Sequence, residues 1–375
     1  MERCSCASIP RASAGFSLVE IMVAVAISLI GIVVVFQVFA VSEGYKRTTT
    51  SGGDAQTNGA LALFTIEREV RMAGYGLNDT SLLSCKVLAY HEGPPVREFN
   101  FRMVPVEITD GASGAPDTIS IMYSTSDLRP KPARLTQDMP SPSATFKVDN
   151  RYGFVEGDLI IAAEPGKDCT LAEVTGVPGT PGRSDNVIHN SGNYTNAEGQ
   201  NVSAKYNKPG GLGVAYTTNG KLFNLGGKPV ANLYSIANGK LQVQALLVSA
   251  SATPIVDGIV QLQAEYGKDD GINNGTVTNA SYVADDGIVD RYDAVSPPAG
   301  DALAWSRIIA LRFAVVARSA LPERPDPDGV CRTTTKAPTW AGGNIDLSAD
   351  PNWRCYRYKV FETTVPIRNL IWKPA

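Results

Sequence analysis

A long uncharged apolar stretch stands near the start of the chain. From Ile21 to Ser42 no residue is charged, and most residues are Val, Ile, Ala or Leu. As an α-helix this stretch is about 33 Å long, enough to cross the hydrocarbon core of a bilayer. A secretory signal cut after Ala40 is the alternative, but its apolar core is usually only about 7–15 residues long. The pattern therefore predicts a membrane-spanning helix.

A second helical pattern follows, and we expect an amphipathic continuation over residues 43–76. Thr and Gly residues in Tyr45–Gly53 lower the helix propensity locally. Gly74 and Gly76 are suited to the C-terminal stop. Apolar residues recur at spacings of three and four, which predicts one buried stripe: Leu63, Ile66, Val70 and Ala73. Charged residues are expected on the remaining surface: Glu67, Arg68, Glu69 and Arg71.

Alternation of apolar and polar residues, the period of a half-buried strand, begins near residue 80. Asn238-Gly239 stands between two alternating runs and predicts a hairpin. The stretch 176–227 is rich in Gly, Asn, Ser and Thr and is expected to form surface loops. The fold class is therefore α+β, with a long N-terminal helix and a mostly antiparallel β-sheet head over 77–375. Further strands are expected within 117–123, 154–163, 259–266, 308–317 and 358–367.

Composition and motifs argue against several classes of function. The 375 residues include 35 Gly and 24 Pro, which suits a loop-rich head, and 19% are charged. A net charge of −3 argues against a nucleic-acid-binding protein, which needs a concentrated basic face. The sequence has no Walker loop, dinucleotide fingerprint, G-x-S-x-G or H-E-x-x-H motif, and two histidines leave few general bases. We therefore expect a protein that is not an enzyme.

Glu20 is an acidic residue directly before the apolar stretch. A carboxylate at the centre of a bilayer costs about 2.5–3.5 kcal/mol, and less near the interface. Snorkelling to the interface, with no further role, is one interpretation. The other is that Glu20 pairs with a cation that a partner molecule supplies.

The segment Gly15-Phe16-Ser17-Leu18-Val19-Glu20, followed by about twenty apolar residues, resembles the N-terminus of type IV pilins and type II secretion pseudopilins. The resemblance implies a class III leader, residues 1–15, that a prepilin peptidase removes between Gly15 and Phe16. It also implies methylation of Phe16 and an assembly helix over 16–42. Glu20 would then neutralise the N-terminal amine of a neighbouring subunit during assembly.

The resemblance narrows further in three phrases. Residues 67–76 (EREVRMAGYG), 256–267 and 360–369 are similar to the minor pilins of the PilW family, whose nearest relatives are the GspJ-type minor pseudopilins. This implies a lollipop-shaped subunit that primes pilus assembly, in a complex at the pilus tip. Its partners would be other minor pilins, the major pilin, the prepilin peptidase and the inner-membrane assembly platform.

The resemblance also implies a location. The leader would lie in the cytoplasm, the helix in the inner membrane and the head in the periplasm, before the subunit enters a surface pilus that serves adhesion and twitching motility. Lys/Arg counting does not decide this orientation, because Lys46 and Arg47 balance Arg3 and Arg11.

Two other functions remain open. A type II secretion minor pseudopilin shares the whole N-terminal interpretation, and the gene neighbourhood would distinguish the two machines. A tip adhesin would use the 176–227 loops to bind a surface ligand. Deleting those loops and comparing pilus number with adherence would separate binding from assembly.

Four cysteines remain after the leader, with Cys4 and Cys6, is removed. Four cysteines allow three pairings, and the compartment outside the inner membrane permits disulfides. We favour two disulfides over four free thiols, and the second would close a loop with little apolar content. Because the head has no C-x-x-C motif and both histidines are distant in sequence, we expect no zinc site. The favoured pairs are Cys85–Cys169 and Cys331–Cys355.

Two acidic, Gly- and Asn-rich stretches invite a calcium interpretation. They are Lys268–Gly275 and Asp285-Asp286-Gly287, and neither has the spacing of an EF-hand loop. Turn formation alone explains these residue types. We therefore expect no cofactor and keep calcium as the alternative, which a titration followed by melting temperature would test.

Overall fold

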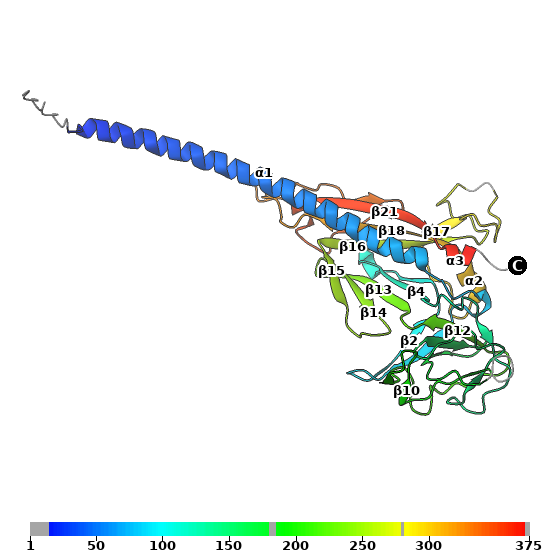
Figure 1. Ribbon diagram of the computed structural model, residues 1–375. Coiled ribbons are helices and arrows are strands. Elements are labelled where there is room, and N and C mark those ends of the chain that lie inside the picture. The colour runs from blue at the N-terminus through cyan, green and yellow to red at the C-terminus, as the bar shows by residue number, and fades with distance from the viewer. Residues whose placement is uncertain (1–14, 180–184, 279–280, 372–375) are drawn as a thin grey trace, which may run out of the picture. The chain divides into compact units, whose positions relative to one another are not determined.

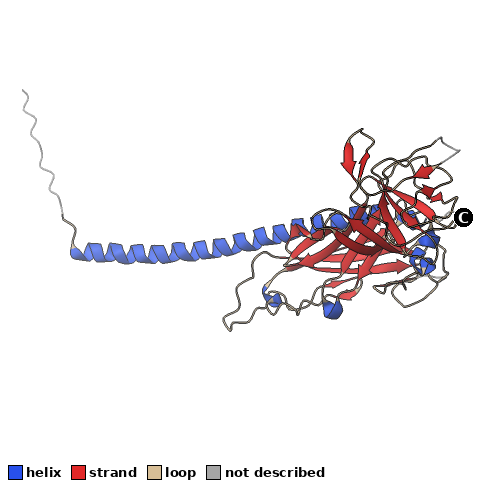
Figure 2. Cartoon of the chain, turned by 90° about the horizontal axis from the view of Figure 1, so that it is seen from below, coloured by secondary structure: helices blue, strands red, loops and turns tan. Residues whose placement is uncertain are grey.

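A computed structural model describes residues 15–179, 185–278 and 281–371. Residues 1–14 of the predicted leader lie outside the described residues. The chain divides into two compact units, Met1–Gly53 and Asp54–Ala375. The fold is α+β, with a long N-terminal helix and a head built mostly of antiparallel strands (Figures 1 and 2).

Helix α1 spans Leu18–Met72 and includes the Tyr45–Gly53 segment that propensity marks as weak. The chain has no proline between Pro10 and Pro94, so every residue of α1 can donate its backbone N–H. The head unit begins at Asp54, and it therefore contains residues 54–72 of α1 in addition to the strand-rich region that the sequence placed at 77–375. Gly74 and Gly76, with φ of +80° and +79°, follow the end of the helix as expected.

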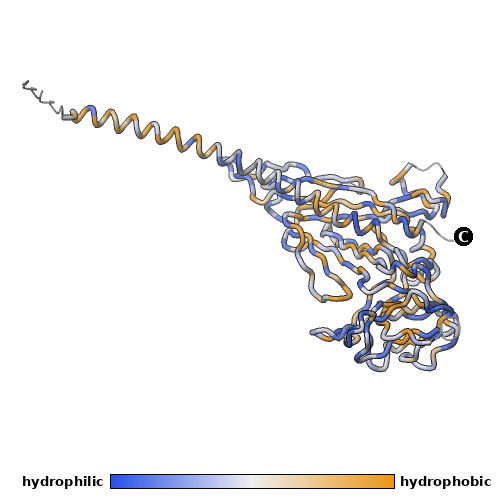
Figure 3. Tube along the Cα trace, viewed as in Figure 1, coloured by the Kyte–Doolittle hydropathy of each residue, from blue (hydrophilic) through white to orange (hydrophobic). Residues whose placement is uncertain are grey.

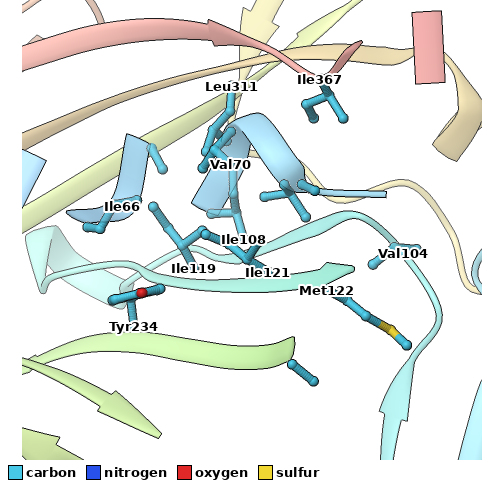
Figure 4. Close-up of a cluster of buried hydrophobic side chains, with 14 of the residues drawn as sticks. Ile66, Val70, Val104, Ile108, Ile119, Ile121, Met122, Tyr234, Leu311 and Ile367 are labelled. Atoms are coloured by element: carbon cyan, nitrogen blue, oxygen red, sulfur yellow. The ribbon is translucent and has the colours of Figure 1, made fainter. Parts of the chain in front are cut away.

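The apolar stripe of α1 forms the centre of the head. Ile66 and Val70 are fully buried, and Figure 4 shows them between Leu311 on one side and Ile119 and Ile121 on the other. The stripe predicted from periodicity is confirmed for Ile66, Val70 and Ala73, which are fully buried, while Leu63 is half-buried and packs against the same core. Its charged surroundings differ from the expectation at Glu69.

Glu69 does not lie on the exposed surface of α1, contrary to expectation. It is only 7% exposed, and its carboxylate accepts two hydrogen bonds from Asn232 Nδ2, at 3.0 and 3.2 Å. A buried carboxylate is costly unless its oxygens are hydrogen-bonded. The amide of Asn232 meets that need, and no periodicity in the helix could have shown this partner.

A four-stranded antiparallel sheet packs on α1. Gly59 permits the close approach of the edge strand, because a Cβ at this position would lie 2.1 Å from the ring of Phe361. The segment between β18 and β21 covers the other face with Ile345 and Leu347. The strand order is β17 (Arg291–Asp293), β16 (Ile259–Lys268), β18 (Ile308–Arg318) and β21 (Tyr358–Pro366).

A five-stranded antiparallel sheet lies on the opposite side of the α1 stripe. Its β13–β14 hairpin closes through Asn238 and Gly239, both with positive φ, so the predicted turn is confirmed. The order is β15 (Thr253–Asp257), β14 (Lys240–Ala245), β13 (Val230–Ala237), β4 (Thr118–Tyr123) and β3 (Val106–Thr109).

The third large sheet of the head has six strands. It contains the one parallel pairing among the described strands, between β1 and β8. Its strand β12 is buried, so the expectation that 176–227 forms surface loops is wrong for this segment. The apolar residues Leu222, Phe223 and Leu225 carried the missed signal. The order is β2 (Arg97–Arg102), β1 (Lys86–His91), β8 (Cys169–Glu173), β7 (Leu159–Ala163), β12 (Lys221–Gly226) and β5 (Ala133–Arg134).

Short elements fill the connections. The two-stranded pairs are β6 (Phe146–Lys147) with β9 (Asn186–Val187), β10 (Asn193–Thr195) with β11 (Asn201–Ser203), and β19 (Thr339–Trp340) with β20 (Gly343–Asn344). The short helices are α2 (Ala302–Ser306), α3 (Arg368–Ile371) and the 3₁₀ turns Thr80–Leu82, Ala112–Gly114 and Trp353–Cys355. The other strands that alternation predicted are confirmed as β4, β7, β16, β18 and β21.

The fold predicts unequal effects for two apolar residues on α1. Ile66→Ala removes a fully buried side chain and is expected to lower the free energy of unfolding by about 2–5 kcal/mol. Phe64→Ala is the matched control, since Phe64 is 61% exposed and surface substitutions usually change stability by no more than about 0.5 kcal/mol. Urea unfolding of the full chain measures both, and equal losses would contradict the packing of the stripe.

Candidate functional site at the start of helix α1

The predicted processing and assembly residues lie together at the N-terminal end of α1. Gly15, Phe16 and Ser17 precede the helix, which begins at Leu18, and Glu20 stands in its first turn. Phe16 is 84% exposed, and among the described residues beyond its chain neighbours no atom lies within 4 Å of the position where a Cβ of Gly15 would stand. The Gly15–Phe16 bond is therefore accessible in the described structure.

Ser17 and Glu20 form a capping box that the sequence analysis missed. Ser17 Oγ accepts a hydrogen bond from the backbone N–H of Val19 at 3.2 Å, and Glu20 Oε2 accepts one from the backbone N–H of Ser17 at 2.9 Å. Both bonds satisfy donors that the first helical turn leaves without partners. The S-x-x-E spacing was readable from the sequence, and it gives Glu20 a local role besides the predicted pairing.

Electrostatics also favour a carboxylate at this position. The N-terminus of a helix carries a partial positive charge, and a negative side chain in the first turn gains about 0.3–1 kcal/mol at an exposed site. Glu20 is exposed, and among the described residues its carboxylate accepts a hydrogen bond from the Ser17 N–H. A carboxylate accepts several hydrogen bonds, so Glu20 retains capacity for a cation from outside the chain.

The helix that follows exposes its apolar side chains on every side. Among the described residues, one helical segment is long and apolar enough to cross a bilayer, Leu18–Gly44. Figure 3 shows the corresponding run of hydrophobic residues along α1. Phe36 and Phe39, for example, are 70% and 68% exposed. Such a surface requires lipid or the apolar helices of other subunits around it.

The cysteines of the head lie in two pairs. Cys85 is bonded to Cys169, with Cα atoms 5.9 Å apart, and Cys331 is bonded to Cys355, with Cα atoms 4.8 Å apart. Of the three possible pairings, the structure contains the one that the sequence favoured. Both bonds lie within the head unit.

The acidic loops considered for calcium use their carboxylates within the chain. Asp269 accepts hydrogen bonds from the backbone N–H groups of Asp286 and Gly287, at 3.3 and 2.7 Å, and burial raises the pKa of Asp269. Burial by itself raises the pKa of Asp270, but the Arg291 guanidinium outweighs burial and lowers this pKa below its ordinary value. Among the described residues no group of three or more His, Cys, Asp or Glu could hold a metal ion.

Two family models match the chain. Residues 234–369 match the model of PilW, the type IV pilus-assembly protein W, and residues 10–36 match the prokaryotic N-terminal methylation motif. The first match covers β14, β16, β18 and β21 of the head, and the second contains the capping box and the greater part of the apolar span Leu18–Gly44, up to Phe36. No curated protein and no solved structure matches the chain.

Proposed function

We propose that this chain helps to prime pilus assembly in a tip or initiation complex. Its two family matches support a type IV pilus minor pilin of the PilW family. The observation that carries the proposal is the constellation at the start of α1. An accessible Gly15–Phe16 bond lies just before a helix whose first turn holds Glu20 and whose segment Leu18–Gly44 is long and apolar enough to cross a bilayer.

The chemistry of assembly follows from these residues. Cleavage after Gly15 would create a new ammonium group on Phe16, and a subunit entering the fibre would bring that group into an apolar environment. An isolated charge there is strongly disfavoured, whereas a paired one is tolerated. Glu20 of the neighbouring subunit would supply the partner charge. The pairing would also set the axial register of the two helices.

The apolar helix would serve two environments in turn. As a membrane segment it would hold the subunit in the inner membrane, with the head in the periplasm and the leader in the cytoplasm. As a fibre segment it would pack among the helices of other minor pilins and the major pilin. A prepilin peptidase and an inner-membrane assembly platform are the further partners that this route requires.

Processing is the first test of the proposal. We expect the membrane-extracted protein to begin at Phe16 and to carry a methylated N-terminus, because the exposed Gly15–Phe16 bond lies directly before the capped helix. Intact mass together with N-terminal analysis measures both. A polypeptide that begins at Met1 or at Val41 would rule out the assembly mechanism, since no ammonium group would then stand next to Glu20.

A further inference from the structure

A large part of the head is inserted between two residues that pair directly. Strand β4 ends at Tyr123 and β13 begins at Val230, and these two residues are register partners. Residues 124–229 therefore leave the five-stranded sheet and return to the same place. They precede the PilW match, which starts at residue 234. We call residues 124–229 the inserted segment; its strands β10 and β12 are labelled in Figure 1.

The inserted segment has a core of its own. One face of β7, β8 and β12 packs toward the α1 core, through Ile161, Leu171 and Phe223 among others. The other face packs on a second cluster within the inserted segment, which contains Phe146 and Tyr216. A separate core holds the surrounding loops in place. The proposed charge pairing at Glu20 does not involve the inserted segment.

A cavity of about 340 Å³ opens in the inserted segment, and the described residues that line it lie between positions 142 and 212. This volume is at the lower end of the range for small-molecule sites. Apolar residues of the lining include Pro142, Phe146 and Leu212. Polar groups come from hydroxyl, amide and ring side chains, chiefly Ser143, His189, Asn190, Ser191 and Tyr206.

Hydrogen bonds fix the walls of the cavity. Asn207 is 5% exposed, and its amide donates to the carbonyls of Glu173 and Asn190, at 2.8 and 3.0 Å, while its Oδ1 accepts from the Glu173 N–H at 2.8 Å. The side chain of Asn207 thus ties two wall segments to strand β8. On the other side, the ring of His189 stacks on Phe146 at 4.4 Å, and His189 Nε2 lies 3.0 Å from the Ala144 carbonyl.

The lining of the cavity is mostly uncharged. Among the described residues that line it, Lys208 is the one charged side chain, and its ammonium is paired with Glu98 at 2.8 Å. Burial lowers the pKa of His189, so the imidazole is neutral at pH 7. The exposed side chains of Ser143, Asn190 and Ser191 offer neutral donors and acceptors. A ligand that suits these walls is uncharged, has hydrogen-bonding groups along its edges and has apolar faces.

A sugar ring has this combination, with hydroxyl groups at its edge and C–H groups on its faces. We propose that the cavity of the inserted segment binds an uncharged saccharide unit. The proposal goes beyond fibre assembly, because it concerns a part of the head outside the PilW match. It holds whether the subunit serves a pilus or a secretion machine.

The test is ligand-detected saturation-transfer NMR on the full-length protein in a zwitterionic detergent without a sugar headgroup. The probes are glucose, galactose and N-acetylglucosamine, with glucuronic acid and glucosamine as charged comparators. We expect saturation transfer to at least one neutral sugar, and weaker binding of its charged analogue.

Two variants and a control locate the binding. Ser191→Trp fills the cavity and is expected to weaken binding of the responding sugar at least tenfold. Asn190→Ala removes one exposed amide and is expected to weaken it about threefold or more. Thr195→Trp places the same bulk on the exposed strand β10, outside the cavity, and should bind as the wild type does. Circular dichroism melts of all three establish that the fold is kept.

Three outcomes would overturn the proposal: no transfer from the wild-type protein to any neutral sugar, unchanged affinity in folded Ser191→Trp and Asn190→Ala, or tighter binding of a charged analogue than of its neutral parent. Assembly is measured separately, by immunoblot of sheared fibres. A Ser191→Trp protein that enters fibres normally but binds no sugar would support the proposal. A wild-type protein that binds sugar yet enters no fibre would refute the assembly role and leave the saccharide site standing.

Discussion

Replacing Glu20 by glutamine is expected to leave the protein in the membrane and to remove most of it from pili. Glutamine at this position keeps the capping box, because its side-chain oxygen can still accept from the Ser17 N–H at the distance that Glu20 Oε2 now occupies, 2.9 Å. It carries no negative charge, so it cannot neutralise the ammonium group of a neighbouring Phe16. Glutamine therefore separates charge pairing from helix capping.

The size of the effect follows from the cost of an unpaired charge. Leaving a buried ion without its partner is destabilising by about 3–5 kcal/mol, which corresponds to a loss of more than a hundredfold in an equilibrium constant. We expect a comparable decrease in incorporation, measured by immunoblot of sheared fibres against the membrane fraction in a strain without the wild-type copy. Glu20→Ala, which loses both functions, should be at least as defective.

The control is Glu43→Gln, since Glu43 is an exposed glutamate near the other end of the Leu18–Gly44 segment. It should insert and assemble as the wild type does. If Glu20→Gln were incorporated normally while Glu20→Ala were not, Glu20 would act through the capping box alone. Normal incorporation of both variants would leave no role for this carboxylate in assembly.

Removal of the Cys85–Cys169 disulfide is expected to lower stability more than removal of the Cys331–Cys355 disulfide. The bond closes a loop with a sequence separation of 84 residues, which the chain-entropy model values at about 4.5 kcal/mol. It lies beside the parallel pairing of β1 with β8, which consists of the residue pairs Val87–Cys169 and Leu88–Thr170. Because the parallel pairing of β1 with β8 contains two residue pairs, few backbone hydrogen bonds hold the two strands together. A disulfide beside it therefore stabilises the pairing considerably.

The variant is the double substitution Cys85→Ala/Cys169→Ala, which avoids placing a hydroxyl group in the fully buried position of Cys169. The matched control is Cys331→Ala/Cys355→Ala, whose loop separation of 24 residues predicts a smaller loss of about 3.5 kcal/mol. Urea unfolding of the full-length proteins in detergent measures both. A loss for the first pair that is equal to or smaller than the loss for the second would contradict this ranking.

Local patterns predicted much of the fold because they report local physics. The period of 3.6 placed Ile66 and Val70 on one stripe, and the period of two placed most of the long strands. Asn238-Gly239 predicted its hairpin because both residues tolerate the positive φ that the turn needs. The S-x-x-E spacing of Ser17 and Glu20 was equally local, and attention to helix capping would have revealed it.

Local sequence patterns could not predict contacts between residues that are far apart in the chain. Glu69 has the sequence context of a surface residue, and its burial depends on Asn232, which stands 163 positions away. Strand β12 lies in a Gly- and Asn-rich region, and its burial follows from pairing with β7 and from packing on both faces. Polar composition lowers strand propensity, but such tertiary contacts override it.

By itself the sequence determined the N-terminal part of this protein: the apolar span, the acidic residue at its start and the Gly-Phe bond before it. These features act through hydrophobicity, charge and peptide chemistry within a few neighbouring residues. The tertiary structure decided how the head is built, because it set which residue pairs with Tyr123, which face of β12 meets which core, and which loops enclose the cavity. Those arrangements depend on contacts between residues that are far apart in the chain, from about 60 positions for β12 and β7 to 107 for Tyr123 and Val230, and no local pattern encodes them.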